Sequence, residues 1–376
     1  MKDLMEIRKE IDEIDRELYD LFDRRLRLAG EVAAYKMAHD LPVFDAIREK
    51  EKLNGIADRS KDPFFSHGMV ELFSQIMSIS RKKQYRILAK AGKLSPFDFS
   101  CVKELPYQDA GVVYQGVEGA YGQMAAETFF GGDKGASHVP TWRDAMEELK
   151  DRRADYAVLP IENSTAGSVV ENYDLLAEYD VTIVGEQILE IDHALLGLPG
   201  TNIADLQRIY SHPQAISQCS GYLRAHPQIK AVGMDNTAVS ARKIKQDGDV
   251  TQAAIAAEIN AGLYGLCVLE KAIQDESCNR TRFIIVSNRH IYRENATKVS
   301  ICFELPHETG SLYQSLSHII FNGLNMTRIE SRPIRSKPWQ YRFFVDFQGN
   351  LKDEDTQNAL RGMSEETLKL RILGNY

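Results

Sequence analysis

An apolar repeat at the start of the chain constrains the fold more than any other feature of the sequence. Its residues recur at alternating intervals of three and four, which is the spacing of a coiled-coil stripe on one continuous helix. The repeat consists of Leu4, Ile7, Ile11, Ile14, Leu18, Leu21, Leu28, Val32 and Tyr35. It predicts one long helix with a single apolar face.

One position of this stripe carries a charge. Arg25 stands between Leu21 and Leu28, and a guanidinium on a buried stripe is costly unless an anion or a carboxylate meets it. Arg25 is therefore either a polar residue that sets the register of a helical hairpin or a ligand for an anion. Lys36 favours the second explanation, because it lies eleven residues further on, about 16 Å along nearly the same face.

Arg8 lies too far from this pair to join it within one chain. It is twenty-eight residues from Lys36, which is about 42 Å of continuous helix. If Arg8 serves the same site, a second copy of the chain must supply it through an antiparallel helix pair.

Two shorter helices are expected to follow. Pro42 ends the first helix, and Asp45 opens the second with acidic residues near its positive end. The third helix presents an apolar side that ends at Ser80, with Gln84 one turn beyond. Three thin helices cannot bury a core without a partner.

In these features, residues 1–90 resemble the all-helical chorismate mutase domain, whose intertwined dimer shares its active sites between subunits. The matching positions are Arg8, Arg25, Lys36, Asp45, Arg48, Glu49, Ser80 and Gln84. The resemblance implies a pericyclic rearrangement of the dicarboxylate chorismate, which needs charge stabilisation and positioning but no nucleophile. It also implies that Lys36 and Gln84 face the breaking ether oxygen and that Glu49 takes the ring hydroxyl. Arg25 and Arg8 of the partner subunit would hold the carboxylates.

Composition narrows the class of protein. The 376 residues leave room for two or three domains. The sequence shows no membrane-length apolar stretch and no signal-like N-terminus, so a cytoplasmic protein without membrane association is expected. The net charge of −8 argues against nucleic-acid binding. The five cysteines are odd in number and form no Cys-x-x-Cys, so neither a disulfide framework nor a metal site is expected. No cofactor is expected either.

The pattern changes after an expected linker at residues 91–108. Short strands and helices alternate through residues 109–287, which predicts an α/β domain. A glycine loop at 116–122 precedes a helix that runs to Phe130, and Thr141 caps another with Asp144 at the capping-box position. A buried strand at 156–159 delivers Pro160-Ile161-Glu162-Asn163-Ser164 at its carboxyl end, where open α/β sheets bind ligands.

Several common interpretations of this segment fail. The glycine loop is spaced Gly-x-x-Gly-x-x-Gly and lacks the start, the lysine and the acidic partner of nucleotide loops. His212 has no spaced partners, so a structural role is favoured over a base or a metal ligand. Ser164 and Ser211 stand neither in a Gly-x-Ser-x-Gly motif nor beside an evident base.

Residues 109–287 resemble prephenate dehydratase, a family with two α/β lobes around a cleft like those of periplasmic binding proteins. The matching strings are Gly-x-x-Gly-x-Tyr, Pro-Ile-Glu-Asn-Ser, Ser-His-Pro-Gln, Gln218-Cys219 and Thr281-Arg282-Phe283. The resemblance implies that prephenate loses carbon dioxide and water and that Thr281 contacts the departing hydroxyl. Substrate contacts would come from Asn163, Ser164, Ser211, Gln218, Arg282 and Phe283. Ala120 and Gly122 replace the hydroxyl residues usual around Tyr121.

The last segment, residues 297–376, is predicted to have the element order β-α-β-β-α-β of a ferredoxin-like α+β fold. Two strings resemble the phenylalanine-binding elements of an ACT domain. They are Gly310-Ser311-Leu312, which follows Thr309, and Glu330-Ser331-Arg332, which precedes Pro333. A plain dimerisation module is the alternative, since a fold alone does not define a function. The resemblance implies that L-phenylalanine binds where two such domains meet and lowers dehydratase activity.

The whole chain therefore resembles the bifunctional chorismate mutase/prephenate dehydratase family of phenylalanine biosynthesis, with a multidomain fold. A homodimer or a homotetramer is expected, because the two pairing modes need not coincide. The main alternative is a non-catalytic phenylalanine sensor, which would not need Lys36, Gln84 and Thr281. A periplasmic binding protein would need an export signal, and a prephenate dehydrogenase fusion would need a dinucleotide fingerprint.

Overall fold

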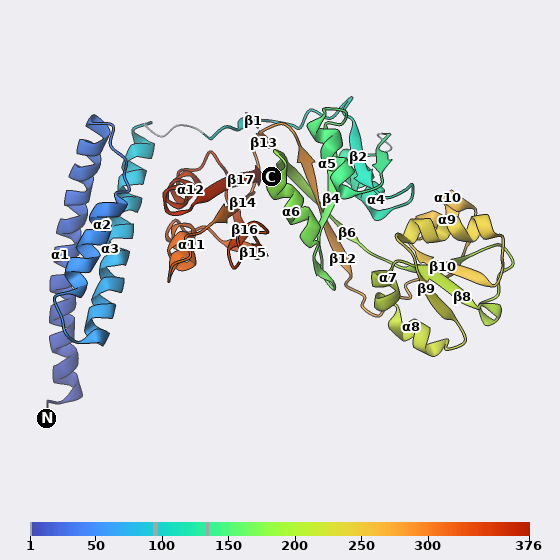
Figure 1. The fold of residues 1–376 in the computed structure, drawn as a ribbon, viewed down its shortest axis with the longest axis horizontal. Helices are drawn as coiled ribbons and strands as arrows, with labels where there is room; N and C mark the ends of the chain where they lie inside the picture. The colour runs from blue at the N-terminus through green and yellow to red at the C-terminus, as the bar shows by residue number, and fades with distance from the viewer. Residues whose placement is uncertain (1, 93–96, 133–134) are drawn as a thin grey trace. The chain divides into compact units, whose positions relative to one another are not determined.

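The structure is a computed structural model that describes residues 2–92, 97–132 and 135–376 (Figure 1). The chain divides into two compact units. One unit combines residues 1–98 with 303–371, and the other combines 99–302 with 372–376. The expected helical and C-terminal segments thus belong to the same unit. Of the expected linker, residues 93–96 lie outside the described residues.

The first unit begins with the three helices that the sequence predicts. These are α1 (Leu4–Ala38), α2 (Ala46–Ala57) and α3 (Pro63–Lys90). Each begins at an aspartate whose carboxylate accepts a hydrogen bond from a backbone N–H of the first turn, namely Asp3, Asp45 and Asp62. Pro63 adds a preset φ angle at the start of α3.

Small residues of α1 face α3, while the apolar stripe of α1 stays exposed. Ala29 and Ala33 are buried, and a Cβ on Gly30 would contact the Ile87 side chain at 3.7 Å. The stripe, in contrast, is exposed along its whole length. Leu4 at its start is 59% exposed, and Tyr35 at its end is 60% exposed. A continuous apolar stripe of this length is unusual on the surface of a monomer and marks an interaction face.

The same unit contains most of the C-terminal α+β region. Its elements are β14 (Lys298–Glu304), α11 (Ser311–Phe321), β15 (Met326–Pro333), β16 (Tyr341–Gln348), α12 (Glu354–Glu366) and β17 (Lys369–Asn375). The strand order β15-β16-β14-β17 together with this chain order is the ferredoxin-like arrangement, which confirms the predicted fold.

The second unit has two lobes, as expected. The first lobe contains a mixed sheet in the order β6-β12-β4-β2-β3. Its strands are β2 (Val112–Gln115), β3 (Ser137–Val139), β4 (Tyr156–Asn163), β5 (Gly167–Ser168), β6 (Thr182–Glu190) and β12 (Arg280–Ser287). Its helices are α4 (Tyr121–Phe130), α5 (Trp142–Lys150) and α6 (Val170–Glu178). Thr141 and Asp144 form the predicted capping box of α5. A short parallel pair joins β1 (Ser100–Val102) to β13 (Ile291–Arg293).

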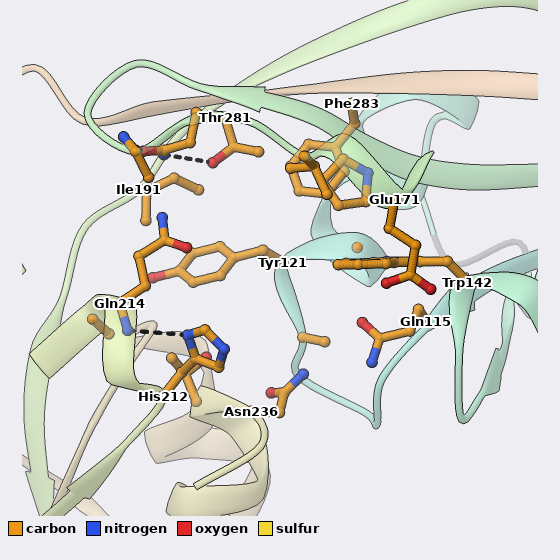
Figure 2. Close-up of a pocket in the computed structure, with 18 of the residues that line it drawn as sticks. Gln115, Tyr121, Trp142, Glu171, Ile191, His212, Gln214, Asn236, Thr281 and Phe283 are labelled. Carbon is orange, nitrogen blue, oxygen red and sulfur yellow. Dashed lines mark hydrogen bonds between the residues drawn. The ribbon is translucent and has the colours of Figure 1, made fainter. Parts of the chain in front are cut away.

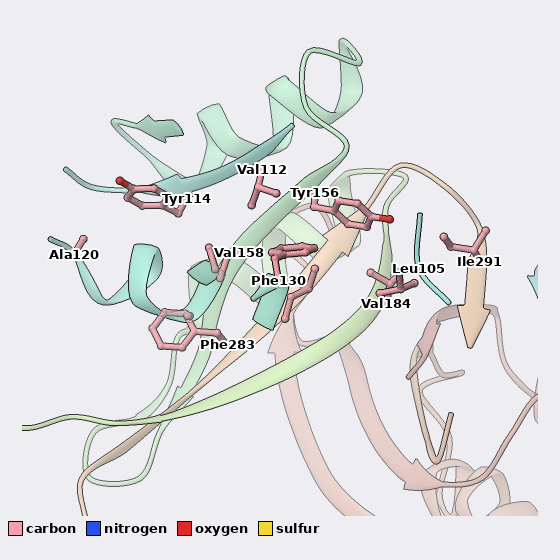
Figure 3. Close-up of a cluster of buried hydrophobic side chains, with 13 residues drawn as sticks. Leu105, Val112, Tyr114, Ala120, Phe130, Tyr156, Val158, Val184, Phe283 and Ile291 are labelled. Atoms are coloured by element: carbon pink, nitrogen blue, oxygen red, sulfur yellow. The ribbon is translucent and has the colours of Figure 1, made fainter. Parts of the chain in front are cut away.

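Aromatic and branched side chains from helix α4 and the sheet fill the core of this lobe (Figure 3). Phe130 packs on Tyr156 with ring centroids 5.3 Å apart, and Val158 and Ile285 are fully buried beside them. This core holds β4 and β12 rigidly side by side, in the register that pairs Thr281 with Asn163.

The second lobe is a five-stranded sheet in the order β11-β7-β10-β8-β9. Its strands are β7 (Ala194–Gly197), β8 (Arg208–Ser211), β9 (Lys230–Gly233), β10 (Gln252–Ala256) and β11 (Cys267–Glu270). Its helices are α7 (Pro213–Gln218), α8 (Ser220–Ala225), α9 (Thr237–Asp247) and α10 (Ile259–Tyr264), with a 3₁₀ turn at η1 (Ile203–Asp205). The chain crosses between the lobes twice, at residues 191–193 and at residues 271–279.

Within the described ranges, no helix is long and apolar enough to cross a membrane. Histidine, cysteine and acidic side chains form no group of three or more suited to a metal ion in the same part of the chain.

Candidate active sites and effector site

A cavity of about 520 Å³ is lined by side chains from both lobes of the second unit (Figure 2). The side chains that could meet a ligand are Tyr121, Trp142, Asn163, Glu171, His193, His212, Gln214, Gln218, Asn236, Thr281 and Phe283. Four of these residues, namely Asn163, Gln218, Thr281 and Phe283, were predicted from the sequence to contact a substrate. The fold brings them to one cavity from three separate elements.

The Thr281 hydroxyl has its acceptor side occupied. Thr281 lies on β12 with 9% of its surface exposed, and its Oγ1 accepts a hydrogen bond of 2.9 Å from Asn163 Nδ2. No acceptor for the Thr281 hydroxyl proton is present among the described residues. The proton is therefore available to a group that binds in the cavity.

The contacts of Asn163 determine which way its amide points. Its Oδ1 accepts hydrogen bonds from the backbone N–H groups of Thr165 and Ala166, at 3.1 and 2.9 Å. Because only the carbonyl oxygen can accept from an N–H, Nδ2 must face Thr281. Nδ2 also donates to Asn279 Oδ1 at 2.8 Å. Asn163 is therefore locked as a donor to Thr281.

A chain of hydrogen bonds continues from Asn163 to the buried His193. Thr165 Oγ1 donates to Asn163 Oδ1 at 2.8 Å, and Gln218 Nε2 donates to Thr165 Oγ1 at 2.7 Å. Gln218 Oε1 is then the acceptor that faces His193 Nε2 at 2.9 Å, so Nε2 carries a proton. Every hydrogen bond from His193 to Thr281 thus points in the same direction.

Burial lowers the pKa of His193, and the hydrogen bond to Gln218 opposes this effect. The imidazole is therefore neutral at pH 7, and its Nδ1 faces the Tyr121 hydroxyl at 3.2 Å. The one proton of the Tyr121 hydroxyl is shared between this nitrogen and the Asp192 carbonyl at 2.9 Å, and burial raises the pKa of the phenol. No sequence signal indicated His193, because it stands alone at the crossover between the lobes.

No lysine or arginine is among the described residues that line this cavity. Several helices instead begin at its wall, among them α4 after Ala120, α6 after Val169 and α9 after Asn236. Neither Ala120 nor Val169 caps its helix with a side-chain hydrogen bond. The positive ends of α4 and α6 therefore offer backbone N–H groups, the usual way in which helices bind anions without a cation.

The glycine loop before α4 joins the two lobes. Gly119 has a φ of +85°, and a Cβ there would lie 2.1 Å from Asn260 Oδ1 on α10. Asn260 Nδ2 donates to the Gly119 carbonyl at 3.1 Å. Ala120 and Gly122 line the cavity on either side of Tyr121, and neither supplies a side-chain hydroxyl.

Three of the predicted substrate residues are not part of the cavity wall. Arg282 alternates with Thr281 and Phe283 along β12, and its guanidinium lies 3.3 Å from Glu162 and 3.4 Å from Glu186. Ser211 is fully buried and donates to the Ile255 carbonyl at 2.7 Å. Ser164 donates to the Cys278 carbonyl at 3.0 Å, which ties the loop after β4 to the loop before β12. His212 caps α7 through Nδ1 and lines the cavity, so it is both structural and accessible.

The helical segment brings together seven of its eight predicted residues. Arg25 donates to Ser80 Oγ and, at 3.3 Å, to the Ile76 carbonyl. Lys36 donates to the Val43 carbonyl at 2.6 Å and lies near the charges of Asp45, Arg48 and Glu49. Burial lowers the pKa values of both Arg25 and Lys36.

Gln84 and Arg8 differ from the other predicted residues of the helical segment in the contacts that they make. Gln84 is buried on α3, donates to the Ser80 carbonyl at 3.3 Å, and leaves its Oε1 without a partner in the described chain. Arg8 is exposed on the first turns of α1 and makes no ion pair there among the described residues. One chain therefore supplies a cationic cluster but not the complete predicted set.

A smaller cavity of about 360 Å³ lies in the C-terminal α+β region. Ser311 and Leu312 of the first predicted effector string line it, and Gly310 is the N-cap of α11 with a φ of +82°. The second string, Glu330 to Arg332, lies on β15 and does not line this cavity. β15 ends the strand order, so one of its edges has no strand partner in the described residues.

A helical cationic cluster, a two-lobed α/β cavity and a ferredoxin-like region in one chain define a multidomain enzyme. A family model described as chorismate mutase type II matches residues 7–85, and one described as prephenate dehydratase matches residues 112–291. A bifunctional chorismate mutase/prephenate dehydratase from Aquifex aeolicus is 32% identical over 381 residues, which span 100% of this chain and 98% of that protein. This chain belongs to the bifunctional chorismate mutase/prephenate dehydratase family.

Two solved structures resemble its larger part. Prephenate dehydratase from Arthrobacter aurescens in complex with L-Phe is 31% identical with a TM-score of 0.65, covering 71% of this chain and 89% of that one. GqqA, named as a quorum quenching acylase, is also 31% identical with a TM-score of 0.64, covering 70% of this chain and 97% of that one. The second name shows that this fold does not by itself define one reaction.

Proposed function

We propose that the helical cluster converts chorismate to prephenate and that the two-lobed cavity converts prephenate to phenylpyruvate. The observation that carries the second step is the Thr281 hydroxyl, whose acceptor side is bonded to Asn163 while its proton is available. A donor held in this way suits a departing hydroxyl group, on which negative charge develops as the carbon–oxygen bond breaks.

In the dehydratase cavity, the carboxylate on the ring leaves as carbon dioxide, and its electron pair makes the ring aromatic while the hydroxyl leaves. Thr281 donates a hydrogen bond to that oxygen, which leaves as water after it takes up one proton that solvent supplies. Asn163 and Gln218 are positioning residues for this donor, and Phe283 packs against the ring. The N-terminal ends of α4 and α6 bind the carboxylates through backbone N–H groups.

The positions of three other residues support indirect roles. Ser164 fixes the loop that carries the acceptors of Asn163, and Ser211 anchors β8 to β10. Arg282 stabilises the sheet through Glu162 and Glu186. We therefore propose that Ser164, Ser211 and Arg282 support the cavity and that neighbouring residues contact the substrate.

In the helical cluster, chorismate is bound as a dianion. Arg25 binds one carboxylate, Lys36 and Gln84 face the ether oxygen, and Glu49 accepts a hydrogen bond from the ring hydroxyl. Asp45 and Arg48 begin α2 beside Lys36, and Ser80 orients Arg25. The rearrangement needs no proton transfer, so charge stabilisation and positioning suffice.

A second copy of the chain completes this site. The exposed stripe on α1 supplies the apolar face for a helix pair, and the partner's Arg8 then reaches the cluster that one chain leaves short of a cation. The C-terminal regions give a second reason for pairing, because the two effector strings do not meet in one cavity of a single chain. A homodimer or a homotetramer would provide both the pairing through α1 and the pairing of the C-terminal regions.

We further propose L-phenylalanine as the effector of the C-terminal cavity. The support is the cavity itself, with Ser311 and Leu312 in its wall, and the L-Phe complex of the related dehydratase. Phenylalanine is made from phenylpyruvate by an amino-group transfer, so its binding would signal sufficient product.

A single experiment tests the proposal. The purified protein is incubated with chorismate alone, and prephenate and phenylpyruvate are followed over time with and without L-phenylalanine. Phenylpyruvate that appears without added cofactor, and more slowly with L-phenylalanine, is the expected result. Prephenate that accumulates without phenylpyruvate would contradict the role of the cavity, and no change in chorismate would contradict that of the helical cluster.

A further inference from the structure

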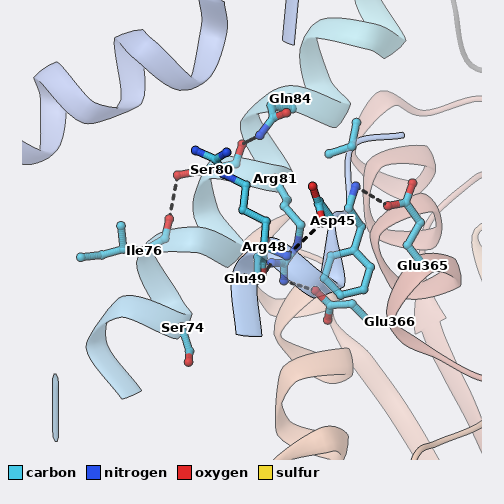
Figure 4. A network of polar contacts seen from close by, with 12 residues as sticks. Asp45, Arg48, Glu49, Ser74, Ile76, Ser80, Arg81, Gln84, Glu365 and Glu366 are labelled. Atoms are coloured by element: carbon cyan, nitrogen blue, oxygen red, sulfur yellow. Dashed lines mark hydrogen bonds and ion pairs between the residues drawn. The ribbon is translucent and has the colours of Figure 1, made fainter. Parts of the chain in front are cut away.

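Arg81 is a buried charge that neither proposed reaction uses. It lies on α3 next to Ser80, is 7% exposed, and has two carboxylates as partners. One is Glu49 on α2, the proposed ligand of the substrate hydroxyl, and the other is Glu366 at the end of α12 (Figure 4). A guanidinium can bond two carboxylates at once because its five N–H donors are fixed in one plane.

The end of α12 contributes more than this one carboxylate. Glu366 also lies 3.0 Å from His318 Nε2 on α11, and Glu365 accepts a hydrogen bond of 2.9 Å from the Phe44 backbone N–H. Phe44 stands beside Val43, whose carbonyl binds Lys36, and its ring lies 4.9 Å from the Arg81 guanidinium. Carboxylates at the C-terminal end of a helix oppose its dipole, so these two depend on their partners for compensation.

We propose that Arg81 is the positioning residue for Glu49 in the mutase site and that Glu366 holds Arg81 in place, so that the C-terminal region of the chain completes the mutase site. This inference rests on the proposed role of Glu49. Without Glu366, the Arg81 side chain has one anchor instead of two and gains rotamer freedom. Without Arg81, the Glu49 carboxylate loses the partner that fixes its direction.

The expected effect concerns binding more than turnover. The hydroxyl of chorismate is present in both the bound substrate and the transition state, so a misplaced Glu49 weakens both states about equally. Arg81→Met should therefore raise the mutase KM about tenfold or more, since a hydrogen bond to a charged group is lost. Glu366→Gln should raise it about threefold, and kcat should stay within about twofold in both variants.

The test uses the full-length protein, chorismate as the varied substrate, and the dehydratase reaction of the same chain as a check on folding. Glu354→Gln is the matched control, because Glu354 on the same helix pairs with Arg86 of α3 at 3.0 Å on the exposed side, away from Arg81. This control should leave KM unchanged. Arg81→Lys should restore part of the affinity, since a lysine can bond one of the two carboxylates.

Three results would overturn the inference. One is an unchanged KM in Arg81→Met, and another is a fall in kcat at constant KM in both reactions, which would show only loss of folded protein. The third is an equal rise of KM in Glu354→Gln and Glu366→Gln, which would indicate general docking of α12. Glu49→Gln is measured in parallel: an unchanged KM there would remove Glu49 from the proposed site, whatever Arg81 does.

Discussion

Changing Asn163 to Asp replaces one NH₂ group by an oxygen at the centre of the proposed dehydratase site. The Oδ1 side of the residue keeps its backbone donors at Thr165 and Ala166, so the new oxygen takes the place of Nδ2. It then faces Thr281 Oγ1 at 2.9 Å and Asn279 Oδ1 at 2.8 Å, where a donor stood before. The Thr281 hydroxyl can relieve this contact only by rotating its proton towards the new carboxylate.

This rotation removes the proton from the substrate. A hydrogen bond to a charged acceptor contributes about 1.5–3 kcal/mol, so the Thr281 proton stays on the carboxylate. The departing hydroxyl then loses its only proposed donor, and removal of one preorganised donor costs about 10²–10³ in kcat. We therefore expect the dehydratase kcat of Asn163→Asp to fall at least a hundredfold.

The assay measures phenylpyruvate formation from added prephenate, with the mutase reaction as an internal control. Asn172→Asp is the matched variant, because Asn172 is fully buried in the same lobe and donates to the Pro160 carbonyl at 2.6 Å without touching Thr281. It places the same charge in a comparable position. A dehydratase kcat in Asn163→Asp within about threefold of the wild type, or an equal loss in Asn172→Asp, would refute the argument.

Three further outcomes are expected. Lys36→Ala should abolish chorismate rearrangement and leave prephenate dehydration unchanged, since the two sites lie in different units; loss of both rates would contradict this. Mixing Arg8→Ala with Lys36→Ala under subunit exchange should restore mutase activity, because one hybrid site is intact, and verified heterodimers without activity would exclude a shared site. Lys82→Met should stabilise the fold by about 1–3 kcal/mol at pH 7. Burial lowers the pKa of Lys82 to about 8 from 10.5, so the unfolded chain binds more protons between these values and stability rises with pH there. Thermal unfolding of Lys82→Met should lack that rise, and an identical pH dependence in both proteins would show that Lys82 is not the cause.

The sequence predicted the elements well because their signals are local. The capping box of α5, the start of α2 at Asp45, and the order of elements in the C-terminal region all depend on residues a few positions apart. Which motif residues meet in the dehydratase cavity was also largely predictable. Asn163 and Thr281 are paired across β4 and β12, and each belongs to a string that was predicted to contact the substrate.

What the sequence did not predict depends on the direction of a side chain and on contacts between residues far apart in the chain. Arg282 belongs to the same short string as Thr281, but a strand sends alternate side chains to opposite faces, and no pattern in the sequence says which face meets the cavity. No residue near Arg81 in the sequence indicates a partner for its charge. Arg81 is buried because α12, nearly three hundred residues further along the chain, supplies its carboxylate partner.

The two proposed sites would bind their dicarboxylate substrates in opposite ways, and the chemistry accounts for the difference. In the rearrangement, both carboxylates of chorismate survive, so arginines that bind them lose nothing in the transition state. In the dehydration, one carboxylate leaves as neutral carbon dioxide. A bidentate guanidinium would stabilise its charge in the bound substrate and would therefore raise the barrier. A cavity wall with helix N-termini and without lysine or arginine among its described residues binds an anion more weakly and avoids this penalty. An arginine introduced there, for example at Gln214, should then lower the KM for prephenate and lower kcat with it; a higher kcat would show that ground-state charge is not what limits the reaction.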